Sequence, residues 1–539
     1  MKTTVQNPYK PFSSFIFRSP YFSIKQLTTW FVELDRSPEY LKEIVVRPDI
    51  QEAIFLASPV LYDEISKYLK DSLKPKDKEK IFFSMLKYLS RMASRCTPFG
   101  LFAGCSVGYI AKETDIRLPD PKDFLKHTRL DMNYLCALAQ NFAKRVELRH
   151  RLLYFPNNSS YIVWNMLRYI EYHFQNGNRQ HNIVAVEHTE YLQCLLKVAR
   201  EGATVAQLTA LLVNDRISYK EAIEYIDELI DNQVLVSELE PSVTGPEFLD
   251  QLINTIEKYD DLQELAAQLK SLSEMLQKVN SLLVGSSIPL YEEIKKFISE
   301  LGTSFNEKHL FQSDMLKPCK RAVVDKKITD DLLEVITFMN KISLRSRQET
   351  LLDRFATSFT DRFEEQEIPL AQLLDAEMGL DLHQLGSSRD MSPLLDGIPF
   401  GVKQQENVSY AWNWVQSMIH RKVIEALIAG ERIIALTEDD VKNVSAEWDD
   451  LSHTISVMCE VLSINPDGTY TIYMPSVSGT GAANLLGRFC HVDKGIHQTV
   501  MDIIHEEEDA LHSDKLYAEI VHLPESRIGN IVARPVLRP

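Results

Sequence analysis

The sequence predicts a mixed α/β and α+β protein with several domains, and three observations support this fold class. Strand-like and helix-like hydrophobic periods both occur within residues 1–150. The chain has 539 residues, which at about 150 residues per domain corresponds to three or four domains. Apolar residues make up 45% and charged residues 25% of the chain, which excludes a disordered or fibrous protein.

The N-terminal region, residues 1–150, contains both kinds of element. We expect strands at 14–18 and 44–46, and helices at 50–57 and 78–92, because the apolar residues of these stretches follow the corresponding periods. The mixture predicts a first domain of the α/β or α+β class.

Residues 151–240 show a different pattern, in which short β-rich runs precede three helical stretches. The expected elements are strands at 152–155, 161–164, 183–186 and 234–236, and helices at 190–200, 204–212 and 218–232. Three helices followed by a strand are the order of a winged helix-turn-helix, so this region is predicted as an embedded module of that type.

Residues 246–301 are predicted to form a long helical hairpin. Leu and Ile recur at helical spacing over 247–279, and no Gly or Pro occurs in 247–280. We therefore expect one long amphipathic helix that docks on a second helix at 290–301.

The last region, 302–539, is predicted as an α/β continuation of the N-terminal region. Gly, Pro and Asp residues favour an irregular connection at 348–401. The other expected elements are helices that start at Tyr410 and Ala482, a strand pair at 454–462 and 469–474 with its turn at 465–468, and strands at 516–523 and 528–532.

Charge and cysteine content restrict the functional classes. The formal net charge of −17 argues against a general polyanion binder, so a nucleic-acid partner would need a local basic site. Seven cysteines without a CxxC pair favour a reducing compartment, and the cytoplasm is the expected location. The sequence shows no signal peptide and no apolar stretch long enough to span a membrane.

The densest group of chemical side chains lies at 91–104, RMASRCTPFGLFAG. If a helix reaches Arg95, Arg91 and Arg95 lie at i and i+4 and present two guanidinium groups on one face. Thr97 and Pro98 would end this helix, and Gly100 would permit an unusual turn. The pattern favours an anion site for phosphate or carboxylate, with surface arginines in salt bridges as the alternative.

This stretch resembles the arginine-rich signature of the lantibiotic (lanthipeptide) dehydratases, in their N-terminal glutamylation region. Further matches to the family occur in the expected order along nearly the whole chain. They are RSP at 18–20, EAI at 52–54, ASPVLY at 57–62, TRLD at 128–131, RY at 168–169, the stretch with Asp314, IPL at 368–370, GRF at 487–489, GNI at 529–531 and RP at 534–535.

The resemblance implies an enzyme that transfers glutamate from glutamyl-tRNA to Ser and Thr side chains of a ribosomally made precursor peptide. Glutamyl-tRNA is the expected co-substrate, with no other cofactor and no metal. In the family, a separate C-terminal domain then eliminates glutamate to leave dehydroamino acids. The expected partners are the precursor peptide with its leader and core, glutamyl-tRNA, an elimination domain or partner subunit, a cyclase and a second copy of the chain.

The resemblance also assigns residues. The catalytic residues that it implies are Arg91, Arg95, Thr97, Asp314 and Arg488. The expected tRNA or anion contacts are Arg18, Arg91, Arg95, Arg145 and Arg149, although a solvated helix face is the alternative for the last two. The family uses further arginines that this chain does not include, so we expect a chain cut within a larger protein, or one half of a split enzyme, with little transfer activity alone.

The predicted winged module suggests a peptide partner. Its third helix carries acidic residues that would repel DNA phosphates, namely Glu221, Glu224, Asp227, Glu228 and Asp231. An extended leader peptide that adds to a strand edge is the preferred interpretation. The candidate leader contacts are Ile183, Val186, Tyr225 and Leu229, and a purely structural module is the alternative.

Two other functions remain open from the sequence. A related ligase could attach an amino acid from aminoacyl-tRNA to a peptide without later elimination. A non-catalytic subunit could bind the leader peptide and complete its site with a partner chain. His491, three residues after Arg488, could assist proton transfer, but a lone histidine is more often structural.

Overall fold

A mixed six-stranded sheet lies at the centre of the computed structural model, which describes residues 7–175, 178–343, 350–375, 377–380, 412–465, 467–479, 481–510 and 518–538. Its strands are β1 (Ser14–Pro20), β2 (Gly100–Ala111), β3 (Asp115–Arg117), β4 (Leu125–Leu130), β10 (Phe311–Leu316) and β11 (Arg321–Asp325). The N-terminal and C-terminal regions thus share one sheet, and the predicted mixed α/β class is confirmed.

Strand β2 organises this sheet. It pairs antiparallel with β1 along one edge and parallel with β10 and β11 along the other. Its residues Leu101, Phe102, Ala103 and Cys105 are buried, as expected for a strand that is covered on both faces. The first residues of β2 therefore lie in the interior, next to β1 and β10.

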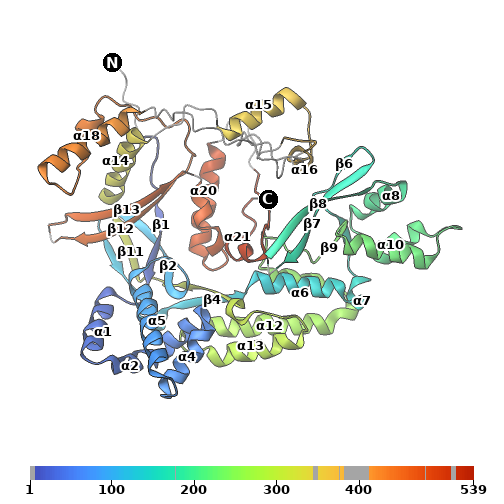
Figure 1. Ribbon diagram of the computed structural model, residues 1–539, viewed down its shortest axis with the longest axis horizontal. Helices are drawn as coiled ribbons and strands as arrows, with labels where there is room; N and C mark the ends of the chain where they lie inside the picture. Colours follow the sequence, from blue (N-terminus) through green and yellow to red (C-terminus); the bar gives the residue numbers. More distant parts are fainter. Residues whose placement is uncertain are drawn as a thin grey trace, which may run out of the picture.

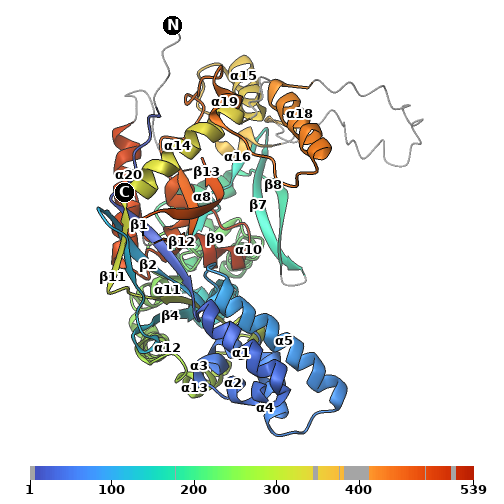
Figure 2. The same cartoon turned by 90° about the vertical axis from the view of Figure 1, so that its left-hand side faces the viewer.

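Five helices cover one end of the sheet (Figure 2). They are α1 (Ile24–Arg36), α2 (Leu41–Val45), α3 (Pro48–Ala57), α4 (Pro59–Leu69) and α5 (Pro75–Ser94). The predicted strand at 44–46 is wrong, because this stretch ends helix α2. Leu41, Ile44 and Val45 are buried in the same apolar cluster as Trp30, and their i, i+3, i+4 spacing places them on one helical face.

A buried ion pair connects three parts of the chain. Lys126 Nζ on β4 lies 2.5 Å from Glu52 Oε1 on α3, and both side chains are fully buried. The same ammonium group donates to Ser287 Oγ at 2.6 Å, and the Tyr291 hydroxyl lies 3.1 Å from Glu52. The pair thereby links the central sheet to α3 and to the helical hairpin.

The predicted hairpin at 246–301 is present, but its first helix is not continuous. The helices are α11 (Phe248–Ile256), α12 (Gln263–Ser281) and α13 (Ile288–Glu300). The backbone of Tyr259 is extended where the helix was expected to continue. The Tyr259 hydroxyl donates to Glu238, which also accepts from the backbone N–H of Leu153 at 2.9 Å. This tertiary contact accompanies a break that local propensity does not predict.

Residues 152–237 form a group of elements at the right of Figure 1. They are β5 (Tyr154–Pro156), β6 (Tyr161–Val163), β7 (Met166–Gln175), β8 (Asn178–Glu187), α8 (Glu190–Ala199), α9 (Val205–Leu212), α10 (Tyr219–Asp231) and β9 (Leu235–Ser237). Thr189, Thr204 and Ser218 cap the three helices through their hydroxyl groups. Strands β6, β7 and β8 make an antiparallel sheet, with β8 at one edge.

Two further helices, α6 (Met132–Lys144) and α7 (Val146–Arg149), connect the central sheet to this group. The other C-terminal elements are α14 (Lys326–Ile342), α15 (Leu351–Phe363), α16 (Leu370–Leu373), α18 (Trp414–Ala429), α19 (Glu438–Val441), β12 (Ser456–Ile464), β13 (Tyr470–Ser478), α20 (Lys494–Asp509) and α21 (Gly529–Val532). Among the described residues, no helix has the length and apolar character that a membrane crossing requires.

Several C-terminal expectations need correction. The stretch 348–401 contains helices α15 and α16, while residues 381–411 lie outside the described residues. The helix expected from Ala482 starts at Lys494, after two short 3-10 turns. The strand expected at 528–532 is a 3-10 turn followed by α21, and residues 518–523 form no strand. The strand pair β12–β13 is confirmed.

Candidate functional site

The GRF segment at 487–489 lies against the central sheet because its phenylalanine is buried there. Phe489 packs with Cys105 of β2 and Ile496 of α20 in one apolar cluster. Gly487–Phe489 forms a 3-10 turn before α20, and α20 contacts both β1 and β2. This packing brings the neighbouring Arg488 to the sheet.

Arg488 and Asp314 form the central ion pair of the site. Arg488 Nη2 lies 2.5 Å from Asp314 Oδ1, and Asp314 is only 2% exposed. Asp314 lies opposite Gly100 in the parallel pairing of β10 with β2, and the register shifts directly after it. Arg129 Nη2, on β4, lies 3.6 Å from the other carboxylate oxygen. A buried carboxylate between two guanidinium groups is a strongly ordered arrangement.

Arg18 joins this group through the register of β1. It lies opposite Cys105 in the antiparallel pairing of β1 with β2. Burial raises the pKa of the Cys105 thiol to about 11, while the charges of Arg18 and Arg488 lower it and Asp314 raises it. All three charged residues are therefore close enough to act on one buried thiol.

The arginine signature begins on α5, but its two arginines do not share a helical face. Helix α5 ends at Ser94, and Arg95 is its extended C-cap, with its N–H 3.2 Å from the Arg91 carbonyl. The condition for a shared face, that the helix reaches Arg95, is therefore not met. Pro98 lies three residues farther on, and it disfavours helical conformation in the residue before it. Gly100 has a φ of +52°, which agrees with the predicted unusual turn.

Arg91 stacks on an aromatic ring, and one of its guanidinium donors has no hydrogen-bond partner among the described residues. Its guanidinium carbon lies 4.3 Å from the centre of the Phe99 ring. Its Nε is buried and has no hydrogen-bond partner among the described residues. Arg95 and Thr97 are exposed. No ion pair or hydrogen bond between described residues connects Arg91, Arg95 or Thr97 to Asp314, although the signature runs directly into Gly100, which lies opposite Asp314.

The guanidinium groups of Arg145 and Arg149 bind other residues of the same chain. Arg145 donates to the Leu301 carbonyl at the end of α13 and to Asn141 Oδ1 at 3.0 Å. Arg149 Nε lies 2.8 Å from Asp227, and its Nη1 lies 2.9 Å from Asp231. Both guanidinium groups are thus occupied by internal partners, and we do not include them in the proposed tRNA site.

Asn530 joins two of the motifs that were quoted for the family resemblance. Its side-chain oxygen accepts from the Met132 N–H at 2.9 Å, and its amide nitrogen donates to Asp131 Oδ2 at 2.9 Å. Its carbonyl accepts from Arg129 at 3.0 Å. The GNI motif therefore binds the TRLD motif through hydrogen bonds of Asn530. The sequence analysis quoted both motifs but did not predict this contact, because 399 positions separate Asp131 from Asn530.

Replacing Asn530 with alanine should lower the free energy of unfolding by about 2 kcal/mol, because it leaves buried polar groups without partners. The measurement is urea denaturation of the purified chain. Asn340→Ala is the control, since Asn340 also bridges two backbone groups, of Glu447, but lies at an exposed site. Equal shifts for the two variants would contradict the structural role of Asn530.

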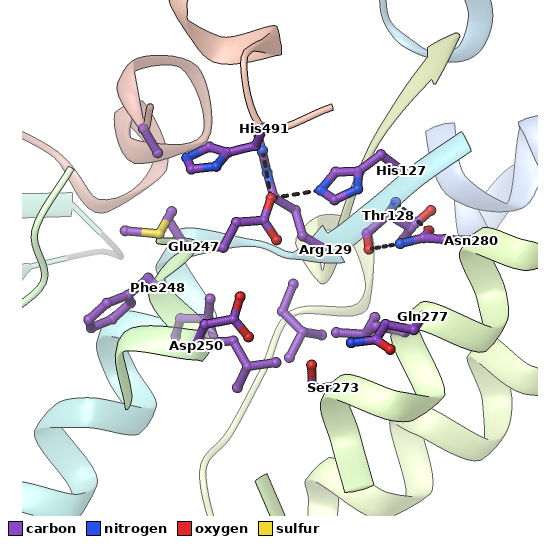
Figure 3. Close-up of a pocket in the computed structure, with 16 residues that line it drawn as sticks. His127, Thr128, Arg129, Glu247, Phe248, Asp250, Ser273, Gln277, Asn280 and His491 are labelled. Atoms are coloured by element: carbon purple, nitrogen blue, oxygen red, sulfur yellow. Dashed lines mark hydrogen bonds and ion pairs between the residues drawn. The ribbon is translucent and has the colours of Figure 1, made fainter. Parts of the chain in front are cut away.

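A cavity of about 170 Å³ lies beside Arg129 (Figure 3). His127, Arg129, Glu247 and His491 meet at one side of it. Burial raises the pKa of Glu247, but the hydrogen bond from His127 and the charges of His127, Arg129 and His491 lower it, and the net pKa is about 2. Burial lowers the pKa of His491. Glu247 and His127 were not among the site residues predicted from the sequence.

The candidate leader contacts do not all lie on the surface. Ile183, on β8, is 56% exposed, whereas Val186 and Tyr225 are partly buried against the main apolar cluster. Leu229 is only 6% exposed and belongs to that cluster. Leu229 therefore does not line an open groove, because its position on α10 faces the core.

Comparisons with known sequences relate the chain to antibiotic biosynthesis proteins. The family described as lantibiotic dehydratase, N terminus, matches residues 46–539. The epidermin biosynthesis protein EpiB of Staphylococcus epidermidis is 23% identical, with coverage of 98% of this chain and 51% of EpiB. The nisin biosynthesis protein NisB of Lactococcus lactis subsp. lactis is 23% identical, with coverage of 90% and 48%. The chain spans about half the length of these curated relatives.

Two solved structures share the fold. The tRNA dependent lantibiotic dehydratase MibB from Microbispora has a TM-score of 0.70 and 17% identity, with 92% of this chain and 47% of that chain covered. The glutamylation domain of TbtB from thiomuracin biosynthesis has a TM-score of 0.53 and 16% identity, with coverage of 87% and 57%. Because the family match covers almost the entire sequence, the chain belongs to the lantibiotic dehydratase family and corresponds to its N-terminal part.

Proposed function

We propose that this chain transfers glutamate from glutamyl-tRNA to Ser and Thr side chains of a ribosomally made precursor peptide, the first step of dehydration in lanthipeptide biosynthesis. The single observation that carries the proposal is the Arg488–Asp314 pair, with Arg18 beside it and the arginine signature adjoining it. The similar structures are described as a tRNA dependent dehydratase and a glutamylation domain, which supports the same reaction.

The chemistry is an exchange of one ester for another. The peptide hydroxyl attacks the glutamyl ester carbonyl, a new ester bond forms, and the terminal ribose hydroxyl of the tRNA leaves and takes up the proton. Since the bond broken and the bond formed are alike, orientation and charge stabilisation can supply most of the rate. The reaction needs cationic groups for the developing oxyanion and for the tRNA phosphates.

Two of these arginines have a donor without a partner among the described residues, as this role requires. The Nε atoms of Arg91 and Arg488 are buried and have no hydrogen-bond partner among the described residues. A buried donor without a partner is costly, and a bound anion would satisfy it. We assign Arg91, Arg95, Arg488 and Arg18 to anion binding and Thr97 to hydrogen bonding with the substrate. Asp314 orients Arg488 in this arrangement.

We further propose that residues 151–240 form a winged helix-turn-helix module that binds the leader peptide at the edge of β8. The backbone N–H of Arg179 points away from β7 and donates to Glu525 at 3.0 Å. Because strands alternate with a period of two, the amides of Ile183 and Ala185 point to the same outer edge. No backbone hydrogen bond occupies these two amides among the described residues, so an extended peptide can add there.

The substitution Ala185→Pro should weaken leader binding about tenfold, because it removes the backbone N–H that would donate to the peptide. Proline is tolerated on an edge strand, so β8 itself should persist. Titration of a fluorescently labelled leader peptide measures the effect. Ala185→Ser keeps the amide and is the matched control. Equal affinities of the two variants would exclude this edge as the binding site.

The four regions 1–150, 151–240, 246–301 and 302–539 remain our proposed division of the chain. The first and last form the transfer site together, since both supply strands of the central sheet. An elimination domain or partner subunit, a cyclase and a second copy of the chain are the further partners that we propose.

The test of this function is incorporation of radiolabelled glutamate from glutamyl-tRNA into a precursor peptide. The assay is run with this chain alone and with a protein that supplies the other half of a full-length relative. We expect leader binding in both cases and efficient transfer only in the second. Equal transfer by the chain alone would favour a stand-alone ligase, and leader binding without transfer in either case would favour a binding subunit.

A further inference from the structure

Five ionisable side chains form a continuous row that ends at Arg488. His127 Nε2 lies 2.6 Å from Glu247 Oε1, and the same oxygen lies 3.3 Å from Arg129 Nη1. Arg129 Nη2 lies 3.6 Å from Asp314 Oδ2, and Asp314 Oδ1 lies 2.5 Å from Arg488 Nη2. Arg129 is thus shared between two carboxylates, one of which holds Arg488.

The side chain of Glu247 contacts His127 and Arg129 and does not cap its own helix. Glu247 is the N-cap residue of α11, yet its side chain makes no capping hydrogen bond. Its carboxylate turns toward His127 and Arg129 at one side of the cavity (Figure 3). The short side chains of Ser, Thr, Asp and Asn are the ones that usually cap a helix, whereas the longer side chain of Glu247 reaches across to Arg129.

We propose that Glu247 is a positioning residue for the transfer site, which acts on Arg488 through Arg129 and Asp314. This inference rests on the proposed function. Glu247 holds one nitrogen of Arg129, so that only the other nitrogen faces Asp314, at the longer ion-pair distance of 3.6 Å. Without Glu247, Nη1 of Arg129 is free to turn toward the Asp314 carboxylate, beside Nη2, which keeps its hydrogen bond to the Asn530 carbonyl. The two nitrogens would then compete with Arg488, whose guanidinium would lose its fixed direction.

Asp250 provides a matched control within the same cavity. It lies one turn after Glu247 on α11 and also lines the cavity. Within the described part of the chain, no ion pair joins Asp250 to Arg129 or His127. The substitutions Glu247→Gln and Asp250→Asn each remove one carboxylate charge from this cavity and keep the shape of the side chain, but only the first removes a charged member of the row.

The kinetic experiment compares these variants in the glutamate transfer assay, with the second half of the enzyme supplied. We expect Glu247→Gln to lower kcat about tenfold with KM values for glutamyl-tRNA and precursor changed less than about twofold. Asp250→Asn should match the unsubstituted chain. The double variant Arg129→Met with Glu247→Gln should be no slower than Arg129→Met alone, because both substitutions interrupt the same row. Unchanged kcat in Glu247→Gln, or fully multiplicative effects, would overturn the proposal.

A second measurement does not depend on catalysis. Phenylglyoxal modifies guanidinium groups, and mass spectrometry of the peptide that contains Arg488 gives the rate at this residue. We expect faster modification of Arg488 in Glu247→Gln than in Asp250→Asn, since a guanidinium with a fixed carboxylate partner is protected. Equal rates would overturn the positioning role. Absence of transfer in the unsubstituted enzyme would contradict the proposed function, while the modification rates would still decide the role of Glu247.

Discussion

Replacement of Arg488 with alanine is expected to lower the rate of glutamyl transfer by about a hundredfold or more, which corresponds to about 3 kcal/mol of transition-state stabilisation. The substitution removes a guanidinium whose Nε has no hydrogen-bond partner in the described part of the chain, and it leaves Asp314 with Arg129 as an ion-pair partner there. Arg91→Ala and Arg95→Ala should abolish transfer, because each removes a further cation of the proposed anion site.

The measurement is mass spectrometry of a precursor peptide after incubation with glutamyl-tRNA and the complete enzyme. Leader affinity should stay unchanged, since Arg488 lies in a turn against the central sheet and the proposed leader site lies on β8. The control is Arg36→Ala, because Arg36 is exposed and forms a surface ion pair with Glu33 one turn earlier on the same helix. Full glutamylation by the Arg488, Arg91 and Arg95 variants would refute the assignment of the site.

The substitution Lys126→Met is expected to lower the free energy of unfolding by about 3–5 kcal/mol. It leaves the Glu52 carboxylate fully buried without its ammonium partner, although the Tyr291 hydroxyl remains 3.1 Å away. The cost arises from an uncompensated charge, so the additional change Glu52→Gln should recover part of the loss. Replacing the whole pair with neutral groups is far less costly than breaking it.

Urea denaturation measures this effect, and hydrogen exchange in α13 shows where the structure loosens. The control is Lys67→Met, which breaks an ion pair with Glu64 on the surface of helix α4, at i, i+3 spacing. A surface pair contributes about 0–1 kcal/mol. A Lys126→Met effect as small as that of the control would mean that the Glu52 charge is relieved in another way.

Local patterns predicted the elements that depend on short-range chemistry. Helices α8, α9 and α10 start where Thr189, Thr204 and Ser218 place a hydroxyl before an apolar period. The turn at Gly100 was also predicted, because a left-handed backbone conformation there suits glycine and few other residues. In each case the residues that decide the conformation lie within one helical turn or one tight turn of it.

Other elements were decided by contacts over long sequence distances. The stretch 44–46 has strand-like residues, but Ile44 and Val45 are buried on a helix against the same cluster as Trp30. The helix expected through Tyr259 is interrupted where this residue bonds to Glu238. Burial overrides a weak local preference, since one buried side chain contributes about 1.5–3 kcal/mol and propensity differences are smaller.

For the site, the sequence by itself determined which side chains are present. Its family resemblance also indicated the candidate catalytic residues Arg91, Arg95, Thr97, Asp314 and Arg488. Only the tertiary structure paired Arg488 with Asp314, excluded Leu229 from the surface, and committed Arg149 to Asp227. It also added Glu247 to the row through Arg129. The physical reason is that a buried charge is stable only beside an opposite charge or hydrogen-bond partner. That partner is chosen by how the strands and helices pack, which neighbouring residues in the sequence do not specify.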